Sequence, residues 1–328
     1  MEGTFIGLAL LAVLVMPAKH PKPFVPLGAA GTLYDATLAR AKALGGEVVT
    51  VASEALKPLC EASCARVLVE PAKRNTAAAI ALAACDAISR HSEEAILVVL
   101  PSDHAIEGDF RATVESLAGL CVGEKALGVM GIEPTGPETG YGYLEAGDAV
   151  EDGFRLKRFV EKPSREKAEA MLQSGRYAWN SGMFVFPLGV LKEEMKRHCP
   201  HIWSAAESFV ERNDASAFNA LGSISIDYAL MEKAGKVVMM RARFSWSDVG
   251  NFASLYAVLP KDSGGNAGWG PGRAESCRNS LLITRRKETL LLGLDGMAFV
   301  ETEAGTLVTP LSKSEQIREG VEAITGKS

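Results

Sequence analysis

The sequence predicts an α/β protein with a doubly wound, mostly parallel sheet and a small C-terminal β-rich domain. Short apolar, β-branched runs alternate with helix-like segments through the first 130 residues, which is typical of a parallel sheet covered by helices. Polar clusters follow several of these runs, as they do where such a sheet holds a ligand. From residue 261 the chain becomes glycine-rich, and short strand-like runs follow. We therefore expect one domain over 1–260 and a second over 261–328.

Composition and charge narrow the class of partner. The chain has 328 residues, 47% of them hydrophobic and 23% charged, which suits a large globular domain with a smaller one beside it. The net charge is −5, and no stripe of lysine and arginine interrupts the sequence. Nucleic acid is therefore not expected as a partner.

The apolar run 5–16 is too short to cross a bilayer, and no basic residue precedes it as one would in a signal peptide. We interpret it as the first buried strand, and we expect no membrane partner. The six cysteines are scattered, with a single C-x3-C pair at Cys60 and Cys64. Free thiols in a reducing, cytoplasmic compartment are expected rather than a zinc site.

The elements of the first half follow in order from their patterns. Residues 96–100 form a β-branched run suited to a central strand, and the alanine-rich stretch 76–90 predicts a helix capped by Asn75 or Thr76. Similar patterns predict strands at 12–16, 47–51, 66–69 and 127–131, and helices at 33–43, 55–62 and 110–121.

The pattern changes after a glycine- and proline-rich loop at 134–142. Beyond it we expect strands at 143–146, 155–160, 183–186 and 237–241, and helices at 166–173, 188–197, 228–233 and 252–258. Residues 261–274 are expected to be a linker because they are rich in glycine. The second domain should then consist of short, β-helix-like strands over 280–308 and a closing helix at 315–324.

Arg74, Asp103 and Asp248 each follow a predicted strand and therefore point to one crevice at the carboxyl ends of the sheet. Two carboxylates together with phosphate oxygens and water are a common environment for Mg²⁺. The plainer interpretation is that Asp103 caps a turn and Asp248 caps the next helix. His104, beside Asp103, is expected to be structural.

Three further positions carry weaker signals. Lys162 follows a strand and could bind a phosphate, or it could be a solvated turn lysine. Asn180 could donate to a sugar hydroxyl, or bond locally at a turn. The glycines of Gly140-Tyr141-Gly142 allow a backbone to approach a ligand closely, or form a tight turn. Neither G-x-G-x-x-G nor G-x-x-x-x-G-K-[ST] occurs, so dinucleotide-binding and P-loop proteins lose their main support.

Taken together, these segments resemble the mannose-1-phosphate guanylyltransferases, a branch of the sugar-nucleotide pyrophosphorylases. The matching stretches run in the family's order and cover most of residues 20–260; they are PKPF (21–24), EPAKRNTAAAIALAA (70–84), VLPSDH (99–104), PTGPETGYGYLEAG (134–147), FVEKP (159–163), YAWNSGMFVF (177–186), SIDYALMEK (225–233) and WSDVGNF (246–252).

The resemblance implies a Rossmann-like nucleotidyltransferase that forms GDP-mannose and pyrophosphate from GTP and mannose 1-phosphate, with Mg²⁺ as cofactor. It also leaves a homo-oligomer open. Lys22 would contact phosphate, and Lys162 would meet the phosphate of the sugar substrate. The remaining roles it implies are metal binding by Asp103 and Asp248, nucleotide binding by Arg74, Asn75, Thr76, Pro101 and Ser102, and sugar binding by Tyr141, Gly142, Glu161 and Asn180.

One family feature is not found in the sequence. The family follows its first strand with a glycine-rich loop of the type GGxGTRLWP, whereas here the strand-like residues run almost directly into Pro17 to Lys22. Such loops hold phosphates with backbone N–H groups and a cation. Three alternatives therefore stand beside the transferase: a catalytically impaired homologue that binds the sugar nucleotide, an enzyme for another hexose 1-phosphate, and an error in the recorded start of the gene.

Overall fold

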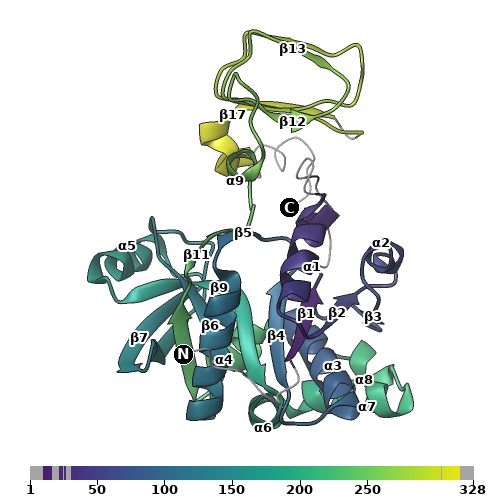
Figure 1. The fold of residues 1–328 in the computed structure, drawn as a ribbon, viewed down its shortest axis with the longest axis vertical. Helices are drawn as coiled ribbons and strands as arrows, with labels where there is room; N and C mark the ends of the chain where they lie inside the picture. Colours follow the sequence, from purple (N-terminus) through teal and green to yellow (C-terminus); the bar gives the residue numbers. More distant parts are fainter. Residues whose placement is uncertain (1–9, 17–21, 25, 27–30, 304, 318–328) are drawn as a thin grey trace. The chain divides into compact units, whose positions relative to one another are not determined.

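The structure is a computed structural model that describes residues 10–16, 22–24, 26, 31–303 and 305–317 (Figure 1). Its contacts divide the chain into two compact units, each considered by itself below. The first unit comprises residues 1–23 and 34–246, and the second comprises residues 24–33 and 247–328. The division thus falls before residue 260, so that the segment 247–260 goes with the second unit.

The first unit alternates strands and helices along most of its length. Its strands are β1 (Leu10–Val15), β2 (Glu47–Ala52), β3 (Val67–Val69), β4 (Ile96–Pro101), β5 (Ala105–Gly108), β6 (Leu127–Ile132), β7 (Tyr143–Val150), β8 (Gly153–Val160), β9 (Tyr177–Pro187), β10 (Val237–Arg241) and β11 (Phe244–Ser247). Its helices are η1 (Lys22–Phe24), α1 (Leu33–Ala43), α2 (Lys57–Glu61), α3 (Asn75–Arg90), α4 (Phe110–Glu124), α5 (Arg165–Ser174), α6 (Leu188–His198), α7 (Pro200–Arg212), α8 (Ser216–Asn219) and η3 (Asp227–Met231).

The described residues form a nine-stranded sheet in the order β3-β2-β1-β4-β9-β6-β10-β8-β7. Strands β3, β2, β1 and β4 are parallel to one another, and β10 is parallel to β6. Strand β9 is antiparallel to both of its neighbours, β4 and β6. The predicted α/β class is confirmed. The sheet is mixed, because β9, which begins well before residue 183, and the strands β7 and β8 are antiparallel to their neighbours.

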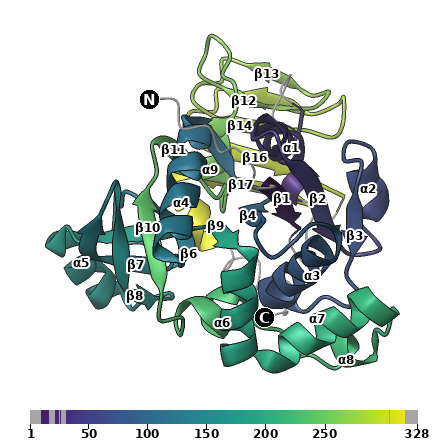
Figure 2. The ribbon, with the colours of Figure 1, turned by 60° about the horizontal axis from the view of Figure 1, so that its bottom comes forward.

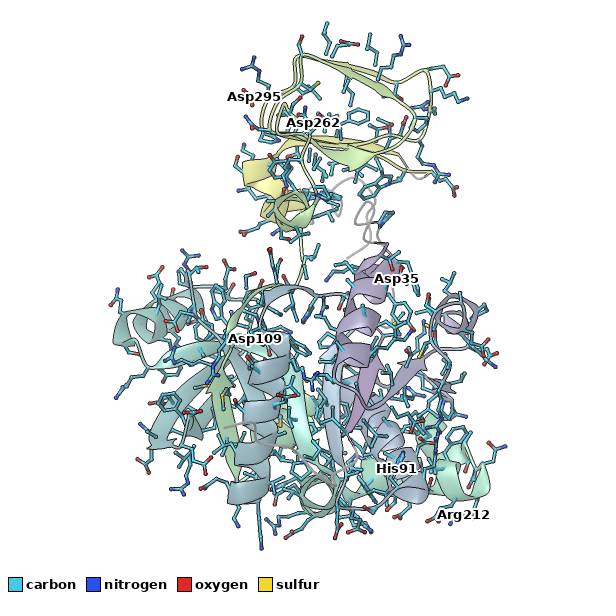
Figure 3. All side chains as sticks on the ribbon, viewed as in Figure 1. Asp35, His91, Asp109, Arg212, Asp262 and Asp295 are labelled. Atoms are coloured by element: carbon cyan, nitrogen blue, oxygen red, sulfur yellow. The ribbon has the colours of Figure 1, made fainter. Side chains whose placement is uncertain are left out.

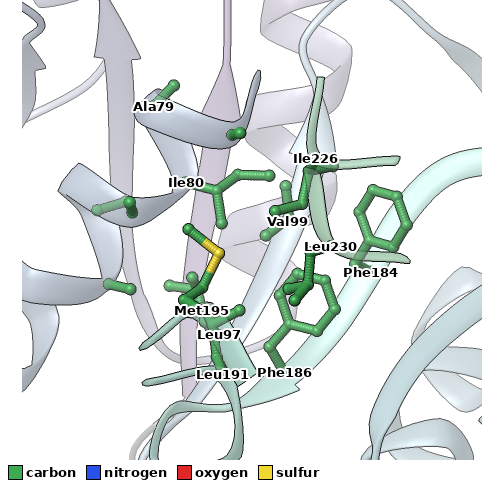
Figure 4. Close-up of a cluster of buried hydrophobic side chains, with 14 of the residues drawn as sticks. Ala79, Ile80, Leu97, Val99, Phe184, Phe186, Leu191, Met195, Ile226 and Leu230 are labelled. Carbon is green, nitrogen blue, oxygen red and sulfur yellow. The ribbon is translucent and has the colours of Figure 1, made fainter. Parts of the chain in front are cut away.

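Both faces of the central strand β4 are buried. Successive side chains of a strand point to opposite faces of the sheet, and in β4 both sets are buried. Leu97 and Val99 of β4 face one core, where they meet Ile80 of α3 and Phe184 and Phe186 of β9 (Figure 4). On this face α3 packs against α7, and α7 also contacts α6 and α8 (Figure 2). The intervening residues of β4 are buried as well, which explains the uninterrupted apolar sequence of this strand.

Helix α4 contacts β6, β9 and β10. Its first turn is capped by Asp109, whose Oδ1 accepts from Ala112 N at 3.1 Å (Figure 3). Helix α3 begins at Asn75 itself, and Arg74 before it makes no side-chain cap. Asn75 Oδ1 accepts from Thr76 N at 2.8 Å, so its side chain satisfies one N–H group of the first turn, whereas Thr76 Oγ1 accepts from Ile226 N instead.

The second unit is built from short strands that pair coil upon coil. Its elements are α9 (Phe252–Val258), β12 (Ala267–Trp269), β13 (Arg273–Glu275), β14 (Leu281–Ile283), β15 (Leu290–Leu292), β16 (Met297–Glu301), β17 (Thr306–Pro310) and η4 (Leu311–Gln316). Strands β12, β14 and β16 stack in parallel, as do β13 and β15. The expected linker at 261–274 is thus wrong in part, because β12 and β13 lie within it. Glycine there serves close packing: a Cβ at Gly268 would lie 1.9 Å from Leu282 O.

Two sequence expectations were incomplete at helices. Helix α7 was not predicted, and the segment 228–233 forms the π-helical turn η3 rather than an α-helix. At the C-terminal end the structure describes the 3₁₀ helix η4, and residues 318–324 of the expected closing helix lie outside the described residues.

The cysteines within the described ranges are free and buried, as the sequence predicts. Burial raises the pKa of the thiols of Cys60, Cys85 and Cys199. Across the described part of the chain, none of the helices combines the length and the apolar character needed to cross a bilayer.

One buried carboxylate organises a turn of the second unit. The side chain of Glu301 is 3% exposed, and its Oε2 accepts from Arg285 N at 2.8 Å, Arg286 N at 3.2 Å and Thr289 Oγ1 at 3.1 Å. The Arg286 guanidinium pairs with Oε1. These donors lower the pKa of Glu301 from 4.5 to about 2, and the Arg285 N–H has the largest effect.

We predict that Glu301 stabilises this turn in a pH-dependent way. Because the folded pKa lies below the unfolded one, the stabilisation is complete above the unfolded value of 4.5 and is lost as pH falls towards about 2. Hydrogen exchange of the Arg285 and Arg286 amides should show less protection in Glu301→Gln near neutral pH, with the difference from the unmodified protein shrinking through that window.

The control for this experiment is Glu303→Gln. The side chain of Glu303 is 82% exposed and pairs with Arg285 at the surface, so its removal should change protection little. Equal protection in Glu301→Gln and the unmodified protein at neutral pH would contradict the prediction.

Candidate functional site

Helix η1 and the carboxyl end of β4 bring a cation and a carboxylate together. Lys22 Nζ lies 2.9 Å from Asp103 Oδ2, and the two side chains are 29% and 14% exposed. Ser102, just after β4, is fully buried, and its Oγ donates to Val15 O at 3.1 Å. That bond joins the ends of β1 and β4, and it fixes the backbone that carries Asp103.

A row of aromatic rings continues from this ion pair. His104 and Trp246 are 5.3 Å apart between ring centroids, and Tyr141 lies 5.3 Å from Trp246 and 5.2 Å from Trp179, all in edge-to-face geometry. Trp246 is carried by β11, which pairs with β5 directly after His104. The row links the end of β4 to the start of β9.

A second polar group surrounds Asn180 of β9. Its backbone N donates to Gly142 O at 2.7 Å, and its Nδ2 donates to Asp227 Oδ1 at 2.9 Å. Gly142 also lies against Glu161, whose Oε1 is 3.3 Å from Lys162 Nζ. Residues from four separate segments therefore meet around one asparagine.

The two carboxylates of this second group lie in a partly desolvated environment. Burial raises the pKa of Glu161, the nearby Asp227 raises it further, and Lys162 opposes both. Burial likewise raises the pKa of Asp227, against the hydrogen bond from Asn180. Paired, partly desolvated carboxylates of this kind are strong acceptors for donors on a ligand, such as hydroxyl groups.

Arg74, Asn75 and Thr76 adjoin the segment that carries Asp227. The Arg74 guanidinium donates to Asn219 O, and Ile226 N donates to Thr76 Oγ1 at 2.8 Å. Asn75 is exposed, with a left-handed backbone at φ 69° that asparagine tolerates better than most residues. Of the three, Asn75 offers the freest surface to a ligand.

Hydrogen bonds thus run from the start of α3 to the loop before β7. Thr76 holds Ile226, the next residue Asp227 holds Asn180, and Asn180 holds Gly142. Asp227 opens the π-helical turn η3, a type of turn frequently found at functional sites. These bonds connect the start of α3 to the loop before β7 through Asp227 and Asn180.

Asp248 lies in the second unit, where its Oδ1 accepts from Gly250 N at 3.2 Å. The structure therefore groups Lys22 with Asp103, and Glu161 and Lys162 with Gly142 and Asn180, within the first unit. The segment 17–21, where the glycine-rich loop would be expected, lies outside the described residues.

The structure adds residues that sequence reasoning missed or set aside. Asp227 and Trp246 lie inside the stretches SIDYALMEK and WSDVGNF, but neither stretch by itself shows which side chain faces the site. Glu70, at the end of β3, has its pKa raised to about 7 by burial, against the charge of Lys73. A carboxylate before a predicted helix start gives no sequence signal of that burial.

The oxygen ligands fit a hard divalent cation only in part. Among the described residues, no cluster of three or more His, Cys, Asp or Glu side chains could hold a metal ion. Magnesium keeps several waters and commonly takes only one or two carboxylates together with substrate phosphates. The partly exposed carboxylate of Asp103 matches that mode of binding, and a cage made only of protein side chains is not what it requires.

Comparison with known proteins shows the family to which the chain belongs. Residues 18–264 match the family described as nucleotidyl transferase. The chain is 36% identical over 321 residues to a mannose-1-phosphate guanylyltransferase of Sinorhizobium fredii (strain NBRC 101917 / NGR234), covering 92% of this chain and 62% of that protein. It is 37% identical over 325 residues to the xanthan biosynthesis protein XanB of Xanthomonas campestris pv. campestris (strain B100), covering 93% of this chain and 68% of that protein. The chain thus spans about two thirds of the length of these relatives.

Solved structures show the same fold. A Thermus thermophilus protein described as a mannose-1-phosphate geranyltransferase superposes with a TM-score of 0.83 at 29% identity, covering 97% of this chain and 99% of that one. A UDP-glucose pyrophosphorylase in complex with UDP-glucose matches with a TM-score of 0.55 at 15% identity, over 76% of this chain and 97% of that one. The second likeness concerns the fold alone.

We predict that a methyl group at Gly142 disturbs the second polar group. A Cβ there would lie 2.5 Å from Glu161 Oε2 and 3.2 Å from Asn180 Cβ, so both side chains would have to shift. Gly142→Ala should weaken binding of a sugar nucleotide, measured by calorimetry, by ~10–100-fold, since small displacements of positioning groups cost that much.

Gly140→Ala is the matched control, because nothing lies within 4 Å of a Cβ at that position. Its affinity for the sugar nucleotide should equal that of the unmodified protein. Equal affinity in Gly142→Ala as well would remove this group from the binding site.

Proposed function

The chain belongs to the nucleotidyl transferase family, and from that membership we propose that it forms GDP-mannose and pyrophosphate from GTP and mannose 1-phosphate. The relatives named as mannose-1-phosphate guanylyltransferases support the choice of sugar and base. The buried free thiols support a reducing, cytoplasmic setting.

In this reaction a phosphate oxygen of mannose 1-phosphate attacks the α-phosphorus of GTP. A new P–O bond forms, the bond from the α-phosphorus to the bridging oxygen breaks, and pyrophosphate leaves with that electron pair. The nucleophile is already an anion at neutral pH, so the protein need not provide a general base. Its task is to align two anions and offset their repulsion.

The observation that carries the proposal is the ion pair of Lys22 and Asp103 at the carboxyl end of β4, where parallel sheets bind ligands. Asp103 would hold Mg²⁺, which when bound would supply positive charge to offset that of the phosphates. Asp248 is proposed as a metal ligand from the family resemblance alone. Lys22 would then turn its ammonium to a phosphate of GTP. Lys162 would hold the phosphate of the sugar substrate.

The second polar group suits the sugar. Glu161 and Asp227 would accept hydrogen bonds from hydroxyls, and Asn180 would orient Asp227. Tyr141 and Gly142 would form the wall of the pocket. On the nucleotide side, Asn75 would contact the nucleotide directly. The residues that shape the nucleotide-binding surface would be Arg74, Thr76, Pro101 and Ser102.

A second candidate is a homologue that binds the sugar nucleotide without turning it over. The observation that favours it is the sequence itself, in which the glycine-rich phosphate loop is not found. A third keeps the reaction and changes the hexose 1-phosphate.

We predict that pyrophosphate is released fastest with GTP and mannose 1-phosphate in a panel that also contains UTP, ATP and glucose 1-phosphate. Coupled phosphate detection with added Mg²⁺ measures it. Tight GDP-mannose binding without turnover would identify the binding homologue, and faster turnover of glucose 1-phosphate would identify the other sugar.

We also predict that Asp103→Asn and Asp248→Asn each lower Mg²⁺-dependent kcat by at least ~100-fold, the usual loss when transition-state charge is left uncompensated. Asparagine keeps the size of the side chain, and circular dichroism checks that the fold is retained. Asp152→Asn is the control, because Asp152 is a surface carboxylate with a 75% exposed side chain. Unchanged activity in either variant would remove that residue from the metal site.

A further inference from the structure

Trp246 fixes which nitrogen of His104 carries the proton. The indole Nε1 of Trp246 donates to His104 Nδ1 at 3.1 Å, and the two rings meet edge to face at 88°. An indole N–H can only donate, so Nδ1 must accept. The proton of the neutral imidazole therefore resides on Nε2 while this bond is in place.

The protonated nitrogen faces the carboxylate of the ion pair. His104 Nε2 lies 4.0 Å from Asp103 Oδ1, while Lys22 Nζ lies 2.9 Å from Oδ2. In the other tautomer, the Nε2 lone pair would face the carboxylate's negative charge and the Nδ1 proton would face the indole proton. Trp246 thus excludes the arrangement that would repel Asp103.

The surroundings hold His104 in this pose. Arg40 donates to His104 O at 2.9 Å, which fixes the backbone, and burial lowers the pKa of that guanidinium only to about 10, so it stays charged. A Cβ at Gly182 would lie 3.9 Å from His104 Cε1, so β9 passes beside the ring. On the far side, the Tyr141 ring packs on Trp246.

We propose that His104 is a positioning residue for Asp103 and that Trp246 sets its tautomer. The Nε2–H of His104 attracts Oδ1 across 4.0 Å, which is longer than a hydrogen bond, and Lys22 Nζ pairs with Oδ2 at 2.9 Å. Both interactions favour one orientation of the carboxylate before a divalent cation arrives. This inference rests on the proposed function, in which Asp103 holds that cation. Partners of this kind behind a metal ligand are worth ~10–100-fold in metal affinity or activity.

The tautomer is tested by ¹⁵N NMR of the histidine rings. The chain has five histidines, and His104→Gln identifies the resonance of His104. We expect an Nε2–H tautomer in the unmodified protein and a mixture in Trp246→Phe, which keeps an aromatic edge but has no N–H. Trp203→Phe is the control, because the Trp203 indole donates to Glu207 in α7, away from this site. An Nδ1–H tautomer in the unmodified protein, or no change in Trp246→Phe, overturns the proposal.

The effect on Asp103 is tested with two variants of His104. Glutamine places an amide donor near the position of Nε2, whereas asparagine reaches only the position of Nδ1. Mn²⁺ binding measured by electron paramagnetic resonance should weaken by ~10–100-fold in His104→Asn and by clearly less in His104→Gln. The Mg²⁺ concentration that half-saturates turnover should change in the same order, with the KM for mannose 1-phosphate little altered.

Equal Mn²⁺ affinity in the two variants and the unmodified protein overturns the positioning role. Equal loss in both variants does so too, because it would mean that the ring merely fills space. If pyrophosphate release fails in the unmodified protein while the tautomer and the order of Mn²⁺ affinities hold, the proposed function is wrong and the positioning of Asp103 stands.

Discussion

The antiparallel course of β9 between β4 and β6 is the constraint on which the candidate site depends. In a purely parallel sheet, only residues that follow strands reach the carboxyl edge. Because β9 runs the opposite way, the residues near its beginning reach that edge as well: Gly182 lies beside Pro101 and His104, and Asn180 pairs with Gly131 of β6. The aromatic row and the second polar group both include a residue from the beginning of β9.

The site separates two kinds of electrostatic environment along one edge. Near β4, Lys22 and Asp103 form an ion pair, as suits the binding and release of phosphates and metal. Near Asn180, burial raises the pKa of Glu161 and Asp227 despite the charge of Lys162, as suits the recognition of neutral hydroxyl donors. A sugar phosphate has a charged phosphate at one end and neutral hydroxyls at the other, so it would match these two environments.

Local pattern predicted most of the strands and helices, because periodicity and apolar runs report burial along a single element. It failed where the decisive contact is distant: β9 looks like a short strand until its pairing with β6 is known, and the glycines of 261–274 look like a linker until each is seen against a neighbouring coil. The local motifs did indicate Asp103 and Asn180 as candidate site residues. Trp246 acquires its role only through His104, far away in the sequence, and no local pattern reports that bond.

The buried thiols have a practical consequence. Alkylating reagents attack the thiolate, and Cys60, Cys85 and Cys199 combine enclosure with pKa values well above neutrality. Native cysteines of this kind react poorly with maleimide dyes, so an exposed cysteine engineered on each compact unit can be labelled selectively. Fluorescence energy transfer between two such labels would then report the distance between the units in solution, with and without nucleotide.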